Sequence, residues 1–443
     1  MILIYTDNIT ARLKYAFNLV FGNILGIEIS FTDNKDDYLK AGTPKLYYSN
    51  QKPDFEISKN DNNQNGLFIY ASDLLFETEI KPQNIVVFDY EDQKVMFPTN
   101  NFSLLPFDPF ASIFYIVTRY EEYLPFDADI HNRFTSCNSI LSKNDILDKP
   151  IVNIWALLLL KKIKEYYPEI ESANRKFQFI STIDIDNAYA FKYKGFIRTI
   201  AGLAKSFFYN FKEIKSRVST ISGYKNDKYD TYLYIENSHK KYNLKPIFFF
   251  LIGKYGKYDK NLSSNNNNFR KLIFELAGKY NIGLHPSYIS NNNFNSLAKE
   301  KKDLSEIVNK EITKSRMHFI KLKFPDTYKN LIQINIREDY TMGFPEICGF
   351  RAGICTPFKF YNLSDEIETN LTVFPFQIMD LTLNKYMKLS PSDAINYIES
   401  IINRIKEVNG TFISIWHNES LCEAGIWKNW RMVYEKMLEL AEK

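Results

Sequence analysis

From Phe177 onward the chain alternates between strand-like and helix-like segments, and this alternation constrains the fold more than any other feature. One helical segment is sharply marked, because Ser390 suits an N-cap, Pro391 the first helical position and Gly410 the end. The apolar runs typical of strands are FQFISTID, KPIFFFLIG, NIGLHPS, NLTVFPFQIM and TFISIWH. Alternation of this kind predicts parallel strands joined by helical crossovers, and a (β/α) barrel is the expected closure at this length.

The preceding part of the chain predicts a smaller α/β domain. Its short strand-like runs are ILIYT, IEISFT, KLYYS and GLFIYAS. Amphipathic helices are expected after Thr10 and after Asp108, and a third lies in KPIVNIWALLLLKKIKEYY. The polar segment 168–175 then separates the two patterns. We therefore expect an N-terminal α/β domain of unknown role over residues 1–170 and a barrel domain over residues 176–443.

Composition excludes several classes of protein. Hydrophobic residues make up 45% of the 443 residues and aromatic residues 16%, which supports a large core and argues against disorder. A net charge of +4 is too small to suggest a nucleic-acid partner. The four cysteines are scattered without a C-x-x-C pair, so reduced thiols are expected. The longest apolar run is too short to span a bilayer, and the start is a poor signal peptide, so we expect a cytoplasmic protein.

Residues 192–230 are basic and aromatic and interrupt the first predicted crossover. An amphipathic surface, an active-site flap and a solvated helix with an apolar underside all fit this pattern. The solvated helix is the simplest of the three interpretations.

Two aspartates, Asp184 and Asp186, stand at the carboxyl end of the strand predicted in FQFISTIDID. Residues at i and i+2 of a strand point to the same side, so both carboxylates project together. They lie at the end of the strand where (β/α) barrels build their sites. Adjacent buried carboxylates repel each other unless a cation or an asymmetric environment separates their roles. The alternative is an exposed strand end with solvated side chains.

Histidines elsewhere in the chain favour a cation site at the two aspartates over an exposed strand end. His285 and His417 both end predicted strands in the same half of the chain, and His318 in SRMHF is a third, weaker candidate. His131 and His239 lie in polar contexts, and we interpret both as surface residues. Aspartate and histidine together form the ligand set of a divalent cation such as zinc.

Two further polar residues suit a supporting role. Arg351 stands in the glycine-containing stretch CGFRAGICTPF, and its guanidinium could hold a carboxylate in one pose. Asp380 ends the strand in PFQIMDLTL, and a carboxylate next to a histidine fixes its tautomer. The alternatives are a structural ion pair for Arg351 and a helix N-cap for Asp380.

Along the chain, an aspartate pair at a strand end is followed by a strand-end histidine, an arginine in a glycine-containing loop, an aspartate and a second strand-end histidine. This order resembles that of the polysaccharide deacetylase family, the NodB-homology domain of carbohydrate esterase family 4. The stretches STIDIDNAYA, IGLHPSY, SRMHF, DYTMGF, GFRAGICTPF, MDLTL and WHNESL look like one bacterial branch of it. LPFDPFASIFYIVTRYEEYLPF resembles the uncharacterised N-terminal domain of that branch. The resemblance implies a distorted (β/α) barrel of about seven strands. It also implies a divalent metal, with zinc first and cobalt or manganese as alternatives, and hydrolysis of an N- or O-acetyl group on a saccharide.

The family's residue roles carry over position by position. The resemblance implies the catalytic base at Asp184, metal ligands at Asp186 and His285, the arginine that orients the base at Arg351, the residue that tunes the catalytic histidine at Asp380, and the general acid at His417.

The sequence departs from the family pattern at two places. Ile185 separates the two aspartates, which are usually adjacent, and Ile289 occupies the usual place of a third metal ligand. His318 is the expected substitute ligand. Two alternatives stay open: a catalytically inactive saccharide- or protein-binding pseudoenzyme, and a cyclic-amide hydrolase on the same scaffold.

Overall fold

A four-stranded parallel sheet forms the centre of the N-terminal part in the computed structural model, which describes residues 1–53, 66–209 and 211–442. The strand order is β2-β1-β3-β4. Its strands are β1 (Ile2–Tyr5), β2 (Ile29–Thr32), β3 (Lys45–Ser49) and β4 (Leu67–Tyr70), and an antiparallel pair follows in β5 (Val87–Tyr90) and β6 (Gln93–Met96). All four predicted strands of this part are confirmed.

The helices of this part are α1 (Ala11–Phe17), α2 (Lys35–Lys40), α3 (Pro109–Val117), α4 (Ile140–Lys143) and α5 (Ile151–Lys164), and side chains cap the N-termini of the first four. Thr10 accepts a hydrogen bond from the amide of Leu13, as an N-cap does, and Asp108 accepts two amides of α3. The helix predicted after Asp108 is shorter than expected. It ends at Val117, since Arg119 adopts a left-handed φ of 56°.

A second, nine-stranded sheet dominates the rest of the chain, with the order β12-β13-β11-β10-β9-β8-β7-β15-β14. Every neighbouring pair is parallel except β12 and β13. The strands are β7 (Gln178–Ile185), β8 (Ile247–Leu251), β9 (Asn281–His285), β10 (Lys314–Ser315), β11 (Glu338–Asp339), β12 (Phe358–Asn362), β13 (Ile367–Val373), β14 (Ile378–Met379) and β15 (Thr411–His417). The prediction of an α/β architecture with parallel strands is therefore confirmed.

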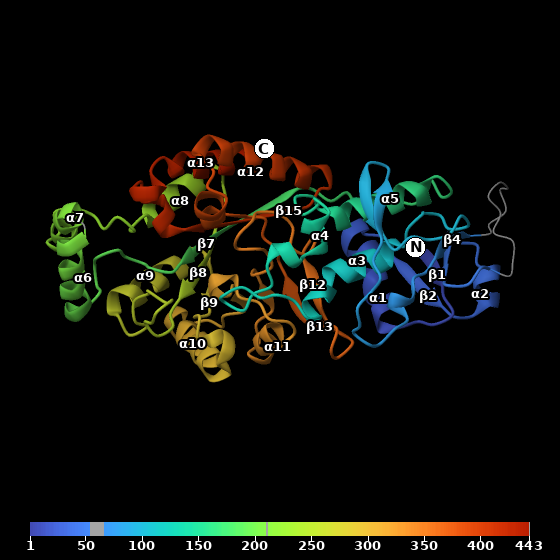
Figure 1. Cartoon of the computed structure of the whole chain (residues 1–443), viewed down its shortest axis with the longest axis horizontal. Helices are drawn as coiled ribbons and strands as arrows, with labels where there is room; N and C mark the ends of the chain where they lie inside the picture. Colours follow the sequence, from blue (N-terminus) through green and yellow to red (C-terminus); the bar gives the residue numbers. More distant parts are fainter. Residues whose placement is uncertain (54–65, 210, 443) are drawn as a thin grey trace.

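Helices flank this sheet on two sides (Figure 1). The helices α8, α12 and α13 run along one side of the strands, and α9, α10 and α11 lie on the other, while α6 and α7 extend beyond the sheet at one end of the molecule. Their bounds are α6 (Phe196–Tyr209), α7 (Phe211–Ile221), α8 (Tyr232–Lys241), α9 (Asn267–Ala277), α10 (Phe294–Val308), α11 (Asp326–Gln333), α12 (Pro391–Glu407) and α13 (Trp430–Glu442). Ser390 caps α12 as predicted. None of the helices formed by the described residues is long and apolar enough to cross a membrane.

The two ends of the large sheet are joined by a short stretch of chain. Residues 374–377 connect β13 to β14, and these strands lie near opposite ends of the strand order. The amides of Phe374 and Phe376 donate to the carbonyls of Asp339 and Met342, and the amide of Gln377 donates to Ile413. An apolar cluster that includes Phe249, Phe376 and Ile413 packs together here.

The two parts share one hydrophobic core. A single cluster of buried side chains runs from Ile2 through the α3 and α5 helices to α13. Polar contacts add to it, since Arg12 forms an ion pair with Glu366 at 2.5 Å and the Asn153 amide group donates to Thr356. The polar segment 168–175 thus separates two sheets along the chain but does not separate two cores.

A second predicted helix is also shorter in the structure: the sequence LAKEKKDLSEIVNKEITKSR, residues 297–316, is typical of one continuous helix. The helical pattern of residues 297–316 ends at Val308 in α10, because Asn309 takes a left-handed φ of 52° and caps the helix. The chain then forms the two-residue strand β10. This change of element places the SRMHF segment at the end of a strand, beside the other site residues.

Candidate metal-dependent active site

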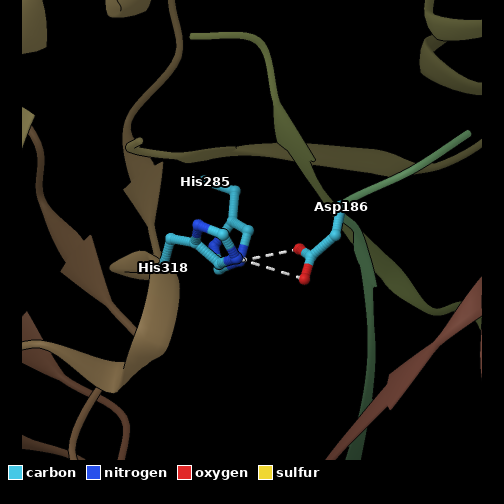
Figure 2. A group of neighbouring side chains, drawn as sticks. All are labelled: Asp186, His285 and His318. Atoms are coloured by element: carbon cyan, nitrogen blue, oxygen red, sulfur yellow. Dashed lines mark ion pairs between the residues drawn. The ribbon is translucent and has the colours of Figure 1, made fainter. Parts of the chain in front are cut away.

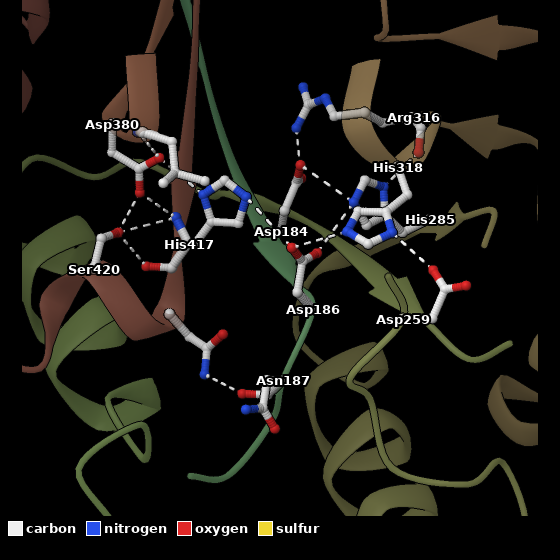
Figure 3. A network of polar contacts seen from close by, with 12 residues as sticks. Asp184, Asp186, Asn187, Asp259, His285, Arg316, His318, Asp380, His417 and Ser420 are labelled. Carbon is white, nitrogen blue, oxygen red and sulfur yellow. Dashed lines mark hydrogen bonds and ion pairs between the residues drawn. The ribbon is translucent and has the colours of Figure 1, made fainter. Parts of the chain in front are cut away.

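Most of the predicted site residues meet at the carboxyl ends of neighbouring strands. Asp184 is the last residue of strand β7 before Ile185, Asp186 directly follows the strand, and the neighbours of β7 are β8 and β15. On one side His417 ends β15 and stands in register with Asp184. On the other side His285 ends β9, and His318 follows β10. Figure 3 shows the two carboxylates between His417 on one side and the histidine pair on the other.

Asp186, His285 and His318 bring three ligand atoms together. The potential ligand atoms of these residues all lie within 4.8 Å of one another. His285 Nε2 is 3.1 Å from Asp186 Oδ1, and His318 Nε2 is 3.2 Å from Asp186 Oδ2. Figure 2 shows both imidazole rings turning a nitrogen toward the carboxylate. The substitute ligand expected at His318 therefore lies beside the other two.

The remaining ring nitrogens of the two histidines are already engaged. His318 Nδ1 lies 2.9 Å from Asp259 Oδ1, and His285 Nδ1 lies 2.5 Å from the carbonyl oxygen of Arg316. An Nδ1–H that donates to an oxygen leaves the Nε2 lone pair free. Partners of this kind set the orientation and tautomer of metal-binding histidines.

The three side chains fit a divalent cation such as zinc. Asp186 Oδ1 is buried and accepts no hydrogen bond from the described residues, although His285 Nε2 is near it. Ligands 2.0–2.1 Å from a tetrahedral zinc ion stand about 3.3 Å apart, close to the separations observed here. Burial alone would raise the pKa of the Asp186 carboxyl, but His318 and His285 hold that pKa well below its usual range. Burial likewise opposes protonation of His318, yet Asp186 and Asp259 raise its pKa to about 9.

Asp184 has a different partner. Arg316 Nη1 donates to Asp184 Oδ1 at 2.7 Å, and the two side chains are 0% and 2% exposed. The guanidinium also donates to the carbonyl of Tyr340 and lies 4.5 Å from the centre of the Phe249 ring. Sequence reasoning missed Arg316, although it stands in the SRMHF motif two residues before His318.

The predicted pairing of Arg351 with Asp184 is corrected. Arg351 instead forms a two-pronged ion pair with Glu122 of the N-terminal part, at 2.6 and 3.0 Å. Its third nitrogen donates to the carbonyl of Gly343, and Arg119 also donates to Glu122. Burial opposes the charge on Glu122, but Arg351 and Arg119 hold the pKa of this carboxyl below its usual range. The structural ion pair, the alternative left open for Arg351, is the arrangement that the structure contains.

His417 and Asp380 form the pair that the sequence suggests. His417 Nδ1 lies 2.8 Å from Asp380 Oδ1, and the backbone amide of His417 donates to Asp380 Oδ2. Ser420 also donates to this carboxylate. Burial opposes protonation of His417, but Asp380 and then Asp186 raise its pKa to about 10. The imidazole is therefore held as a proton donor, with Nε2 3.8 Å from Asp186 Oδ2.

A cavity of about 470 Å³ connects these groups. It is lined by both aspartates, the three histidines, Glu419 and the aromatic side chains Tyr258, Phe319 and Tyr386. Burial, followed by the charge of Asp186, raises the pKa of the Glu419 carboxyl to about 7. Arg133 of the N-terminal part also lines the cavity. This size is within the range of small-molecule sites in proteins.

The sequence suggests that His131 and His239 are surface residues, but both are at least partly buried in the structure. His239 is fully buried, with Nε2 2.8 Å from Ser181 Oγ and Nδ1 2.9 Å from the carbonyl of Ile235. His131 is half-buried, and its Nδ1 lies 3.1 Å from Tyr288 Oη. The surface interpretation of His239 is wrong, because this residue lies on the buried face of α8 together with Tyr232 and Ile235.

Comparisons with known proteins give a family for the N-terminal part only. Residues 2–168 match the model of a family of unknown function, DUF7033. No curated protein matches the chain.

Solved structures with a similar fold include members of carbohydrate esterase family 4. A Mycobacterium smegmatis protein assigned to the polysaccharide deacetylases is 12% identical over 60% of this chain and 84% of its own, with a TM-score of 0.40. An allantoinase is 9% identical over 60% of this chain and 84% of its own, with a TM-score of 0.37. A pseudoenzyme of the same esterase family from Bacillus anthracis is 13% identical over 60% and 62%, with a TM-score of 0.26.

Proposed function

We propose that the protein is a metal-dependent hydrolase that removes an acetyl group, linked through nitrogen or oxygen, from a saccharide. One observation supports this function above all. A three-residue ligand set, a carboxylate held by its own arginine and a histidine held by its own carboxylate share one cavity. These are the parts that metal-assisted hydrolysis of an acyl group requires.

Asp186, His285 and His318 would hold the cation, for which zinc is our first proposal and cobalt or manganese are alternatives. A bound divalent cation lowers the pKa of a water molecule and polarises the acetyl carbonyl. Asp186 is engaged by two histidines and is therefore unsuited to accept a proton.

Asp184 serves as the general base in this proposal. Arg316 occupies its Oδ1, which leaves Oδ2 to accept the proton of the attacking water. The arginine keeps the carboxylate in one pose, as general base catalysis requires. Asp184 is buried at the strand end, 3.8 Å from His285 Nε2, so the base would lie beside the ligand set.

His417 serves as the general acid. Asp380 holds its Nδ1 and keeps the ring protonated, so Nε2 can donate a proton to the leaving amine or alcohol. The acetyl group then leaves as acetate, and the saccharide keeps a free amine or hydroxyl. Aromatic and polar side chains around the cavity suit a sugar ring, which has both apolar faces and hydroxyl edges.

A closed barrel and a cytoplasmic location belong to the same proposal. The connection 374–377 bonds to Asp339 at the end of β11 and to Ile413 within β15, which supports closure of the sheet between its two ends. The four cysteines are free, as expected for a reducing compartment.

Acetate release tests the proposed function directly. Purified protein is stripped with a chelator, reloaded with Zn²⁺, Co²⁺ or Mn²⁺, and incubated with N-acetylated and O-acetylated saccharides. We expect release with at least one metal and one class of bond, and release about 10²- to 10⁴-fold slower from the Asp184→Asn variant. Binding of a saccharide without release by any metal-loaded, folded sample would favour the pseudoenzyme alternative instead.

A further inference from the structure

His318 lies in a turn that its own sequence does not favour. The two residues after it, Phe319 and Ile320, have φ values of 61° and 53°. This left-handed region is unfavourable for residues with large side chains, and a β-branched isoleucine is particularly unsuited to it. Something outside the turn must therefore hold it, and the turn carries one of the three potential ligands.

The N-terminal part supplies a contact at this turn. Arg133 Nη1 donates to the carbonyl of Phe319 at 2.6 Å, across 186 positions of sequence. The guanidinium is in turn fixed by Asp129, whose Oδ2 accepts from Nε at 2.8 Å and lies 2.7 Å from Nη2. Arg133 is 6% exposed, so water does not compete freely for these bonds.

The loop around Arg133 is itself tied together. Ala128 and Phe134 form an antiparallel bridge across its base. Asp129 Oδ1 accepts the backbone amides of His131 and Arg133, at 2.8 and 2.9 Å. We name residues 128–134 the strap. Its bonds keep Arg133 in place before it meets the turn of His318.

Ring contacts extend the same interface. The Phe319 ring lies 4.9 Å from the ring of His131 in the strap, 5.4 Å from Tyr258 and 5.3 Å from Tyr288, measured between ring centres. The backbone amide of Tyr288 donates to Asp259 Oδ1, the atom that also holds His318 Nδ1. The strap, the aromatic rings and the partner of His318 therefore form one connected group.

We propose that the strap positions the third metal ligand, with Arg133 as a positioning residue for His318. The N-terminal part would thus complete the metal site of the large sheet through a backbone carbonyl, without donating a ligand. This inference rests on the metal site of the proposed function but not on its acetyl-hydrolase activity.

Cobalt binding tests the proposal. Metal-free wild-type protein, Arg133→Ala and Arg133→Lys are titrated with Co²⁺ and followed by visible absorption. We expect Arg133→Ala to weaken Co²⁺ binding by about 10- to 100-fold and to alter the absorption bands, since partners behind the ligands have effects of this size. Arg133→Lys should restore part of the affinity, because its ammonium can still reach a carbonyl.

Arg12→Ala is the matched control. Arg12 is as buried as Arg133 and also ties the two parts together, through its ion pair with Glu366, but it does not line the cavity. We expect this variant to lose stability and to bind Co²⁺ as tightly as wild type. If Arg133 only stabilised the fold, Arg133→Ala would bind Co²⁺ as tightly as Arg12→Ala does.

Hydrogen exchange decides the proposal even when no metal binds. The amides of His318 and Ile320 donate to the carbonyls of Pro286 and Met317, so both are protected in the folded turn. In metal-free Arg133→Ala these two amides should exchange faster than in wild type and in Arg12→Ala. Equal exchange rates at His318 and Ile320 in a folded sample would overturn the proposal, whatever the Co²⁺ titration shows. Faster exchange with failed acetate release would support the strap and refute only the proposed activity.

Discussion

Replacing Arg316 by methionine should strongly destabilise the protein, because it leaves the Asp184 carboxylate buried without its counter-charge. The pair is 2.7 Å apart, and both side chains are almost fully buried. Methionine keeps an unbranched apolar stem at this position, and the change removes the guanidinium that lies 4.5 Å from the centre of the Phe249 ring and 5.9 Å from that of Tyr340. Breaking a buried pair on one side costs about 3–5 kcal/mol, a large fraction of the total stability of a typical protein, which is about 5–15 kcal/mol.

A double-mutant cycle isolates the charge interaction. Asp184→Asn alone leaves the Arg316 guanidinium buried without its carboxylate, so it should also be destabilising. The double variant removes both charges and should be less destabilised than the sum of the single variants by about 1–3 kcal/mol, the usual coupling for residues in contact. The free energy of unfolding is measured by urea titration with a chelator present, because bound metal would add its own binding energy.

Arg351→Met provides the comparison within the same protein. Its partner Glu122 keeps a second ion pair, with Arg119 Nε at 2.7 Å, so less charge is left uncompensated. We therefore expect a smaller loss than for Arg316→Met, and no coupling with Asp184→Asn. Additive effects of Arg316→Met and Asp184→Asn within about 0.5 kcal/mol would refute the reasoning.

Three further outcomes follow from individual side chains. Asp186→Asn should lose bound zinc, as measured by metal analysis. Asp184→Asn should retain zinc but lower kcat by about 10²- to 10⁴-fold. Equal zinc loss in the two variants would contradict separate roles for the two carboxylates. Burial lowers the pKa of His239 from 6.5 to about 4. The stability that the neutral buried imidazole contributes is therefore fully present above pH 6.5 and is lost as the pH falls toward 4. The free energy of unfolding should decrease by about 3 kcal/mol over this range. Urea titrations of His239→Gln should lack this pH dependence, and an unchanged slope would disprove it. Cys137 is exposed, while burial raises the pKa of Cys348 and of Cys355 to about 12, so a thiol reagent should label Cys137 fast and the other two only on unfolding.

The sequence predicts the site best where a functional residue ends a long strand. The strands β7 and β15 carry clear apolar runs, so Asp184, Asp186 and His417 can be placed on one edge of a sheet without a structure. His285 follows from the same argument, because the short run of β9 ends at it. Parallel strands bring their carboxyl ends to the same edge, and local pattern is therefore enough to predict that these four side chains meet.

Short elements and long-range partners escape this reasoning. The strand β10 has two residues, too few for any periodicity, and it follows a helical pattern that hides it. Arg316 therefore could not be assigned to a strand end. Arg351 shows the second difficulty, since Glu122 lies 229 positions away in the other part of the chain. An arginine between glycines predicts a close backbone approach but not its partner. Here the approach is to the N-terminal part, because a Cβ atom on Gly349 would lie only 2.6 Å from the carbonyl oxygen of Leu147.

The order of strands explains why two neighbouring carboxylates acquire different environments. Asp184 and Asp186 share one face of β7, yet the chain bends away after Ile185, so Asp186 is 20% exposed while Asp184 is almost fully buried. The deeper carboxylate meets Arg316, which reaches in from the end of β10 through the apolar cluster. The outer carboxylate meets the two histidines of β9 and the following turn. A cation can then engage Asp186 without reaching the Oδ1 of Asp184 that Arg316 occupies. The repulsion expected between the two charges is relieved by two separate positive groups, and a base and a ligand can coexist one residue apart.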